Sequence, residues 1–337
     1  MTDDVIYEVK DLHRDFPVRG GVLRRTVAHV KAVDGVSLSV ERGKTFGILG
    51  ESGSGKSTVA RIMALIDKPT SGSLHFRTAD GDSHQLDKLT GARRQELQRR
   101  VQMVFQDPYA VFNPRQRVID SFQDVLKAYG VRTPNERRDR ILEALDYVSM
   151  RPEYLNRYPH ELSGGQRQRL SIARALSPRP DVLICDESVS ALDVSVQAQV
   201  LNLLRSIQCE TGITYVFIAH DLSVVRYMSD SVAVMYLGQV MEVLGSDTMH
   251  LEARHPYTKA LIEAVPSADV DRPSSGRPLT GDIPSPINRP PGCPFATRCP
   301  VRVDICDVQK PSLLPVINRQ QQVVACHVVH ASTKVPS

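Results

Sequence analysis

The eight residues from Gly50 to Ser57, GESGSGKS, constrain this chain more than any other segment. They fit the pattern G-x-x-x-x-G-K-[ST], follow the short apolar run Thr45–Leu49, and lead into a helical pattern that begins at Lys56. Phosphate oxygens need several N–H donors that converge on one point, and glycines let a backbone turn tightly enough to provide them. The order of strand, loop and helix therefore predicts an α/β core that binds a nucleotide through its phosphates.

Each position in this loop has an expected role. Lys56 brings a cation to the β- and γ-phosphates, and the Ser57 hydroxyl is a ligand for Mg²⁺. The alternative is a turn that is merely rich in glycine and serine, and it does not explain four fixed letters between a strand and a helix. We expect nucleotide contacts from the whole segment: Gly50, Glu51, Ser52, Gly53, Ser54, Gly55, Lys56, Ser57 and Thr58.

Apolar segments of two kinds alternate along the chain and predict its fold class. Short segments rich in Val, Ile and Phe are expected to be strands, at residues 36–40, 45–49, 101–105, 182–185, 213–219 and 232–236. Stretches with apolar residues every three or four positions are expected to be helices, at 56–66, 138–148, 166–176 and 194–208. The alternation predicts a mainly parallel sheet covered on both faces. The interval from about 107 to 162 has helix signals but no convincing strand, which indicates a helical insert.

Two acids, a histidine and a glutamine stand at the ends of expected strands. Asp186 and Glu187 follow one apolar run, and we assign Asp186 to Mg²⁺. Since consecutive strand residues point in opposite directions, Glu187 is free to act as general base toward an attacking water. His220 and Gln106 end two further strands, at the edge where α/β sheets bind ligands. Spacing alone is weak evidence for a functional role of His220 or Gln106. For Asp186 and Glu187 the alternative is two solvated acids at the end of a strand.

Charge and hydropathy exclude several classes of partner. The formal charge is 42 − 38 = +4, so no strong field draws the chain to acidic lipid, and we expect no nucleic-acid partner. Apolar runs such as 215–219 and 232–237 are far shorter than the roughly 20 residues that cross a bilayer. The first residues, MTDDV, lack a basic region followed by an apolar stretch, so we expect no secretion signal and a cytoplasmic location.

The segment Leu162–Gln166, LSGGQ, resembles the signature of ATP-binding cassette (ABC) proteins and precedes Asp186 at the spacing of that family. Its Ser-Gly-Gly stretch leads into an expected helix, so it is a second helix start suited to an anion. In this family the signature caps the ATP that is held by a partner's phosphate loop. The resemblance thus implies a dimer of cassettes and nucleotide contacts from Ser163, Gly164, Gly165 and Gln166.

The resemblance also gives roles to positions that spacing leaves open. The position of Gln106 at a strand end lets its amide contact Mg²⁺ or water, and the resemblance matches it to the glutamine that couples nucleotide state to the membrane subunits. Asp193 matches the loop that crosses the dimer interface, and His220 matches the histidine that holds the γ-phosphate. Phe16 stands where the family places a ring against adenine, with Tyr7 as a competitor and a core role for Phe16 as the alternative.

A closer likeness is to one branch, the ATP-binding subunits of oligopeptide and dipeptide importers, whose relatives also handle nickel, glutathione and other small solutes. It covers almost the whole chain. The phrases that carry it are FQDPYA at 105–110, NPR at 113–115, RYPHE at 157–161, HPYT at 255–258, PSP at 284–286 and GCPFATRCP at 292–300. The inserted segment 19–31 is similar to the subunit conventionally written second of a paired set.

The likeness to this branch implies a set of partners and a place in the cell. The partners are a sister ABC ATPase in a heterodimer, two transmembrane permease subunits and an extracytoplasmic solute-binding protein. The chain is accordingly expected at the cytoplasmic face of the inner membrane, attached peripherally.

Four cysteines, at positions 293, 299, 306 and 326, lie in or near a proline-rich stretch where we expect no regular helix or strand over 266–315. Because this stretch has little apolar material for a core of its own, we expect bound metal to fold it. The spacing does not choose between zinc, an iron–sulfur cluster and free thiols. The resemblance favours a [4Fe–4S] cluster on Cys293, Cys299, Cys306 and Cys326, while Cys185 and Cys209 are expected in the core.

Together these features predict an α/β fold, a P-loop NTPase core of the ABC type. An antiparallel β subdomain, a helical subdomain at about 107–175 and a proline- and cysteine-rich C-terminal extension complete it, with domains at 1–250 and 251–337. The predicted function is ATP hydrolysis, with Mg²⁺, coupled to import of peptides or related small solutes. The alternatives are a soluble ABC ATPase of DNA repair or translation and an exporter ATPase. The expected catalytic residues are Glu187, His220, Gln106 and Lys56.

Overall fold

The larger of two sheets carries the expected parallel strands. We describe a computed structural model that covers residues 4–20, 25–78, 80–190, 192–264, 284–285, 287, 289–317 and 319–332. Across these residues the larger sheet has eight strands in the order β11-β12-β10-β9-β3-β8-β7-β6. Five neighbouring strands of this sheet run parallel, with Thr45 paired to Tyr215 and Val182 to Thr214. They are β3 (Thr45–Leu49), β6 (Val101–Val104), β7 (Val182–Asp186), β8 (Thr214–Ala219) and β9 (Ser231–Tyr236).

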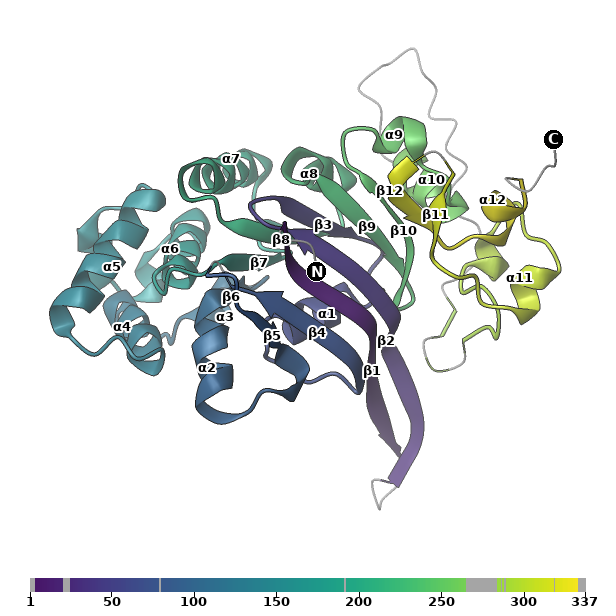
Figure 1. The fold of residues 1–337 in the computed structure, drawn as a ribbon. Coiled ribbons are helices and arrows are strands. Elements are labelled where there is room, and N and C mark those ends of the chain that lie inside the picture. The colour runs from purple at the N-terminus through teal and green to yellow at the C-terminus, as the bar shows by residue number, and fades with distance from the viewer. Residues whose placement is uncertain are drawn as a thin grey trace, which may run out of the picture.

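Helices and a second sheet cover the two faces of this sheet (Figure 1). One face packs against α6 (Gly164–Leu176), α7 (Val194–Thr211) and α8 (Leu222–Met228), and the other packs against α1 (Lys56–Met63) and the smaller sheet. Every residue of β3, β7 and β8 is buried, as expected for strands covered on both sides. The α/β prediction is therefore confirmed. Helix α1 ends at Met63, before the expected residue 66, and Leu65 takes a left-handed φ of 56°.

The smaller sheet is antiparallel, with the strand order β2-β1-β4-β5. Its strands β1 (Val5–Gly20) and β2 (Arg25–Glu41) pair along their whole length and extend as a two-stranded ribbon away from the body of the molecule (Figure 1). The described residues of the inserted segment, 19–20 and 25–31, form part of this ribbon. Strands β4 (Ser71–Arg77) and β5 (Ser83–Gln85), followed by α2 (Gly91–Arg100), complete this part of the fold.

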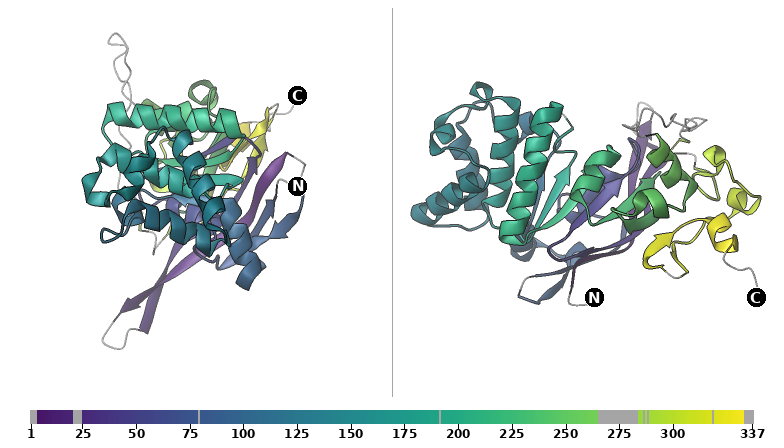
Figure 2. Two further views of the ribbon diagram at one scale, coloured as in Figure 1. Left: turned by 90° about the vertical axis from the view of Figure 1, so that its left-hand side faces the viewer. Right: turned by 90° about the horizontal axis from the view of Figure 1, so that it is seen from above.

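Residues 107–175, all of which the structure describes, contain helices and no strand. They form a block to one side of the sheet, at the end away from the chain's C-terminus (Figure 2). The longest helix there, α5, begins at Pro134 because the Thr133 hydroxyl accepts a hydrogen bond from Glu136 N–H at 3.2 Å. The helices of this block are α3 (Pro108–Val111), α4 (Val118–Ala128), α5 (Pro134–Tyr147) and α6.

The C-terminal segment is built onto the cassette. Strand β12 (Arg319–Val324) pairs antiparallel with β10 (Gln239–Gly245) and with β11 (Leu314–Val316), so it extends the larger sheet. The expectation of no regular structure over 266–315 is wrong for β11 and for α11 (Ile305–Val308). Short helices complete the segment: α9 (Met249–Glu252), α10 (Pro256–Glu263) and α12 (His327–Ser332).

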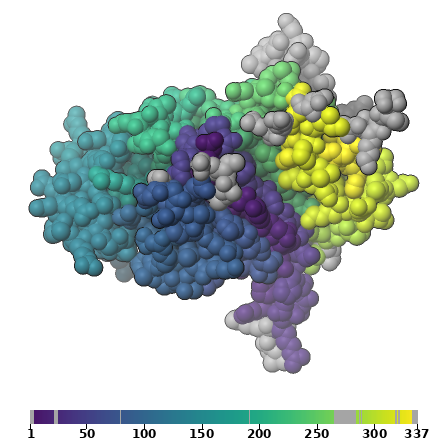
Figure 3. Space-filling view, viewed as in Figure 1, coloured from purple at the N-terminus to yellow at the C-terminus, as the bar shows by residue number. Residues whose placement is uncertain are grey.

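The cassette also supplies the core that the C-terminal segment lacks. Phe295 is fully buried and belongs to the same apolar cluster as Tyr236 of β9 and Tyr257 of α10. Figure 3 shows the C-terminal segment, in yellow, packed directly against the body of the molecule. The expectation that bound metal folds this segment did not include these contacts, because the partners of Phe295 lie far from it in the sequence.

Candidate nucleotide-binding site

The phosphate loop joins β3 to α1 and encloses its lysine. Lys56 is 4% exposed, and its Nζ donates to the carbonyl oxygens of Gly50 at 2.8 Å and Glu51 at 3.0 Å. Two glycines are required by space: a Cβ at Gly50 would lie 2.2 Å from a backbone oxygen, and one at Gly55 would lie 2.3 Å from another. Gly55 also has a φ of 97°, which other residues rarely adopt. The loop is therefore preformed, with its cation held on backbone carbonyls.

Two of the three residues expected at Mg²⁺, Ser57 and Asp186, lie side by side. The Ser57 Oγ donates to Asp186 Oδ1 at 2.9 Å, and the Asp186 carboxyl is buried at the end of β7. Burial raises the pKa of Asp186, although the hydrogen bond from Ser57 acts to lower it. Burial lowers the pKa of Lys56, although the negative charges of Glu187, Asp186 and Glu51 act to raise it. A buried carboxylate and a hydroxyl are oxygen donors of the kind that Mg²⁺ takes, so the residues fit this ion.

Three side chains from three strand ends meet at Glu187. Gln106, after β6, donates from Nε2 to Glu187 Oε2 at 3.0 Å, and His220, after β8, places Nδ1 3.5 Å from the same oxygen. Glu187 itself has a φ of 44°, a strained value for a residue with a side chain. The sequence analysis placed Gln106 on Mg²⁺ or water, and the structure places its amide on the expected general base. A carboxylate with two polar neighbours suits proton abstraction from water.

The signature segment lies at the start of α6 and faces outward. Ser163 is exposed, and its Oγ accepts from Gln166 N–H at 3.3 Å while Gln166 Oε1 accepts from Ser163 N–H at 3.0 Å. This reciprocal pair is a capping box. The segment lines a pocket of about 460 Å³ together with Leu192 and Asp193. The residues expected to meet a partner's nucleotide are thus on one open surface, and no residue of the phosphate loop is among the described residues that line it.

The expected adenine contact is only partly decided by the structure. Tyr7 is fully buried and donates its hydroxyl to the carbonyl oxygen of Met63 at 2.6 Å, so it is a core residue. Phe16, on β1, is 37% exposed, with the guanidinium of Arg14 over its ring at 4.6 Å. The core role for Phe16 is therefore excluded, and its contact with adenine stays a prediction.

Sequence reasoning missed two residues that hold the phosphate loop from the C-terminal side. Glu51 N–H donates to the Tyr257 hydroxyl at 3.0 Å. The guanidinium of Arg298 donates two hydrogen bonds to the Glu51 carboxylate, of 2.8 and 3.1 Å. Tyr257 lies in the segment HPYT and Arg298 in the segment GCPFATRCP, both of which resemble the peptide-importer branch of the family. Nothing in the spacing points from either phrase to residue 51.

Three of the four C-terminal cysteines, Cys293, Cys306 and Cys326, are buried, and Cys299 is half-buried. Burial raises the pKa of Cys293 to about 12, and the charges of the Cys306, Cys299 and Cys326 thiols add to that rise. Yet across the described residues no group of three or more His, Cys, Asp or Glu side chains is placed to hold a metal ion. The expectation for Cys185 is confirmed, since it is buried, but the one for Cys209 is wrong, since α7 leaves it exposed.

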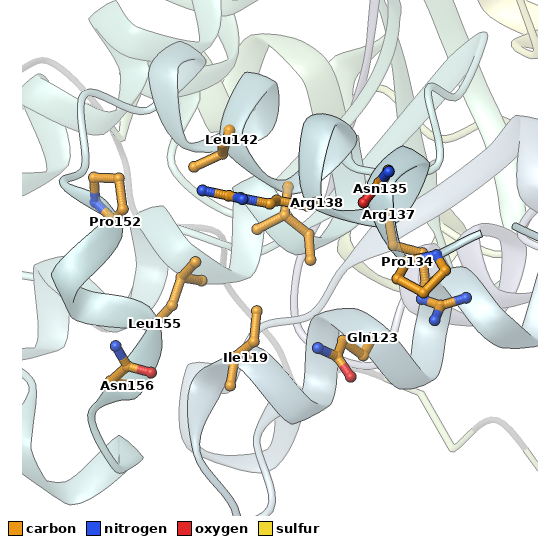
Figure 4. A pocket seen from close by; sticks show the side chains of 11 residues that line it. Ile119, Gln123, Pro134, Asn135, Arg137, Arg138, Leu142, Pro152, Leu155 and Asn156 are labelled. Atoms are coloured by element: carbon orange, nitrogen blue, oxygen red, sulfur yellow. The ribbon is translucent and has the colours of Figure 1, made fainter. Parts of the chain in front are cut away.

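A second pocket, of about 430 Å³, opens on the helical subdomain (Figure 4). Its lining combines apolar side chains with two arginines, and these residues come from α4, α5 and the turn after α5. The lining side chains include Ile119, Leu142, Leu155, Arg137 and Arg138. This pocket involves none of the residues that surround Glu187. Within the described ranges no helix has both the length and the hydropathy to cross a bilayer.

Comparison with known proteins places this site in a family. A family model described as ABC transporter matches residues 33–190, and another described as Oligopeptide/dipeptide transporter, C-terminal region, matches residues 241–306. The chain is 46% identical over 328 residues to the oligopeptide transport ATP-binding protein AppF of Bacillus subtilis, covering 96% of this chain and 98% of AppF. It is 43% identical to a putative peptide import ATP-binding protein of Brucella ovis, over 94% of this chain and 96% of that one.

Solved structures agree with the sequence relatives. The fold matches the ATP-binding cassette MJ0796 in a dimeric, post-hydrolysis state with ADP and Pi, at a TM-score of 0.61 and 27% identity, over 72% of this chain and 99% of that one. It also matches cbiO1 from Clostridium perfringens at a TM-score of 0.61 and 29% identity, over 74% and 92% of the two chains. The fold, the phosphate loop and the signature define an ABC ATPase. The chain belongs to the ABC transporter family, in the group that carries the oligopeptide/dipeptide transporter C-terminal region.

Proposed function

We propose that this chain is the ATP-hydrolysing subunit of an importer for peptides or related small solutes. The observation that carries the ATPase activity is the arrangement around Glu187, next to the paired Ser57 and Asp186. The solute class is supported by the C-terminal region and by the named peptide transport relatives.

The residues divide the chemistry of hydrolysis among them. Lys56 binds the β- and γ-phosphates, and Ser57 and Asp186 hold Mg²⁺, which neutralises charge on the phosphate oxygens. The Glu187 carboxylate accepts a proton from the attacking water, while Gln106 and His220 orient that carboxylate and the water against the γ-phosphate. Phe16 on β1 stacks on the adenine in this proposal.

The working unit that we propose is a dimer of cassettes. The signature residues and Asp193 share an open pocket that contains none of the chain's own phosphate loop. A second cassette with its ATP fits there, with Ser163, Gly164, Gly165 and Gln166 supplying the start of α6 to the partner's phosphates. The dimeric state of the related MJ0796 cassette supports this arrangement. We propose that the partner is a sister ATPase rather than a second copy of this chain.

Two permease subunits and an extracytoplasmic binding protein complete the proposed complex, with the chain on the cytoplasmic face of the inner membrane. The pocket on the helical subdomain is a suitable docking surface for a permease segment, because apolar side chains such as Ile119 and Leu155 line it beside Arg137 and Arg138. The chain runs from Gln106, which is bonded to Glu187, directly into this subdomain. Movement at the nucleotide therefore has a short route to the pocket.

We also propose that residues 251–337 act as a functional extension and that Cys293, Cys299, Cys306 and Cys326 hold a [4Fe–4S] cluster. Four thiols in one largely buried place are a suitable donor set for such a cluster. A single zinc ion would need all four sulfurs at about 2.3 Å from one point, which is a tighter arrangement. Anaerobic purification followed by iron analysis and visible absorption tests this proposal, and an iron-free, colourless protein with four free thiols contradicts it.

Glu187→Gln tests the proposed function. We expect the variant to bind ATP like the wild type and to lose about 10²–10⁴-fold in turnover, because its amide cannot accept the proton. Phosphate release by the complex and binding of a fluorescent ATP analogue are the two measurements. Wild-type turnover in Glu187→Gln would overturn the assignment of the base, and a wild-type chain that binds no ATP would overturn the function.

A further inference from the structure

Arg298, in the C-terminal segment, holds the phosphate loop through Glu51. Glu51 is the second residue of the loop, and its carboxylate is the partner of Arg298, 247 positions away. The pair is bidentate, and the Arg298 side chain is 6% exposed while that of Glu51 is 24% exposed. Arg298 also donates to the Tyr236 hydroxyl at 3.3 Å. A fork-shaped arginine in this geometry fixes both the position and the direction of the carboxylate.

A second contact holds the backbone of the same residue. The Tyr257 hydroxyl accepts the hydrogen bond from Glu51 N–H, and the Tyr257 ring packs with Tyr236 and Phe295 at centroid distances of 4.8 and 5.3 Å. Phe295 lies three residues before Arg298 in the same short turn, where Arg298 N–H donates to the carbonyl oxygen of Phe295. The side chain and the backbone of Glu51 are thus held by one continuous unit.

Glu51 lies at a point where its charge affects ATP. Its carbonyl oxygen accepts from Lys56 Nζ, and its carboxylate is one of the three acids that act on the pKa of Lys56. An unpaired carboxylate here would attract Lys56 and repel the phosphates of an incoming nucleotide. Arg298 neutralises this carboxylate and turns it toward the C-terminal segment.

We propose that Arg298 is a positioning residue of the nucleotide site, which makes the C-terminal segment part of the ATP-binding machinery. This inference rests on the proposed function and adds to it. Arg298 holds the Glu51 carboxylate toward the C-terminal segment and neutralises it, so that the loop keeps the shape and charge that ATP needs. Since Arg298 stands between Cys293 and Cys299, a change in the cysteine cluster that shifts this turn alters ATP affinity.

The test compares three variants of the full-length chain in its complex: Arg298→Ala, Glu51→Gln, and the two together. Binding of a fluorescent ATP analogue, displaced by ATP, gives Kd, and phosphate release gives KM and kcat. We expect Arg298→Ala to raise Kd and KM about tenfold and to leave kcat within about threefold, because the lost partner exposes a negative charge at the phosphate site. Adding Glu51→Gln removes that charge and returns Kd to within about threefold of the wild type.

Rescue by the second substitution separates positioning from a merely structural role. If Arg298 only attaches the C-terminal segment, adding Glu51→Gln to Arg298→Ala does not restore ATP binding, and that result overturns the inference. A wild-type Kd in Arg298→Ala also overturns it. Arg302→Ala is the matched control: Arg302 lies in the same segment, is exposed and pairs only with Asp307 among the described residues, at 2.7 Å. We expect its Kd to stay within about twofold of the wild type.

Two outcomes keep the test decisive. If Arg298→Ala fails to fold, Arg298→Lys replaces it, and we expect a smaller rise in Kd because lysine provides a point charge and no fork. A wild-type Kd in Arg298→Lys at both low and high salt contradicts the proposal. So does a raised Kd in Arg298→Lys that the added Glu51→Gln change does not lower. A wild-type complex that does not bind ATP is a failure of the proposed function, and it is recognised before any variant is compared.

Discussion

Two glycine-rich segments begin helices in this chain, and they differ in how much of the chain surrounds them. The phosphate loop before α1 has a buried Lys56, and Tyr257 and Arg298 hold its residue Glu51. The signature before α6 is open, and the Ser163 side chain has only its own capping box with Gln166 among the described contacts. Both segments offer N–H groups and the positive end of a helix to an anion.

This difference indicates where each anion site is completed. The phosphate loop receives its remaining contacts from the same chain, so it is shaped before a nucleotide arrives. The signature has a pocket of about 460 Å³ in front of it and keeps its donors directed outward. In our proposal the missing contacts come from a second cassette. The predictions below test this contrast.

The largest effect is expected at the phosphate loop. Lys56→Ala removes the buried cation, and we expect ATP binding by the chain to weaken by about 100-fold or more, since a lost charge partner in a buried site costs about 2–5 kcal/mol. Turnover falls with it. Equilibrium binding of a fluorescent ATP analogue measures the loss. Lys68→Ala, at an exposed lysine just past α1, is the control, and similar losses in both variants would contradict the role of Lys56.

A charge at the signature is expected to act differently. Ser163→Glu places a carboxylate where the partner's phosphates approach, so we expect turnover of the complex to fall by about 10–100-fold through repulsion. Binding of ATP to the separate chain stays within about twofold, because its own phosphate loop is untouched. Ser163→Thr, which keeps a capping hydroxyl, retains most activity. A loss of ATP binding by the separate Ser163→Glu chain would break the contrast between the two segments.

The smallest effect concerns the charges that attach the C-terminal segment beside the phosphate loop. Asp34 accepts from Gln239 at 2.8 Å and pairs with Arg289 and Lys310 at 3.3 Å each. Burial acts to raise the pKa of Asp34, but Lys310, Gln239 and Arg289 together outweigh it and hold the pKa below the ordinary value. We expect Asp34→Asn to lower the free energy of unfolding by about 1 kcal/mol at pH 7.

The sign of the pH dependence follows from the lowered pKa. A carboxylate whose folded pKa is depressed stabilises the fold above its unfolded pKa of about 3.9, and that stabilisation disappears as the pH falls through the folded value. The difference between wild type and Asp34→Asn therefore shrinks below about pH 4. Urea unfolding followed by tyrosine fluorescence measures it, since the chain has no tryptophan.

Ser163→Ala loses a helix cap, and we expect it to lower the free energy of unfolding by about 1 kcal/mol at every pH. A loss that depends on pH would contradict the contrast between the two segments.

Much of the site was predictable because its chemistry is local in the sequence. Lys56 and Ser57 begin a helix after a strand and its loop, and Asp186 ends a strand, so each polar residue comes after an apolar run in the sequence. His220 and Gln106 needed the resemblance to a family, because a single polar residue at a strand end has many explanations. The parallel sheet followed from the alternation of short apolar runs with helical periods.

The contacts of the C-terminal segment were not predictable in this way. Arg298 lies in a proline-rich stretch without periodicity, and its partner is 247 residues away, so no local pattern connects them. Strand β12 carries three consecutive glutamines and has only two valines, and it becomes a strand because β10 offers an edge to pair with. Phe295 looks isolated in the sequence and is buried against side chains from β9 and α10 and against His255. Tertiary contacts decide these elements.

The separation between Glu51 and Arg298 also sets an order of events during synthesis. A ribosome adds about 5–20 residues per second, so the 247 positions that separate Arg298 from Glu51 take roughly 12–50 s to make. Throughout that time a nascent chain has a complete GESGSGKS sequence but no arginine to hold its glutamate. The arginine that holds Glu51 is thus made well after the phosphate loop, so in our inference a nascent chain binds ATP more weakly until Arg298 reaches its place.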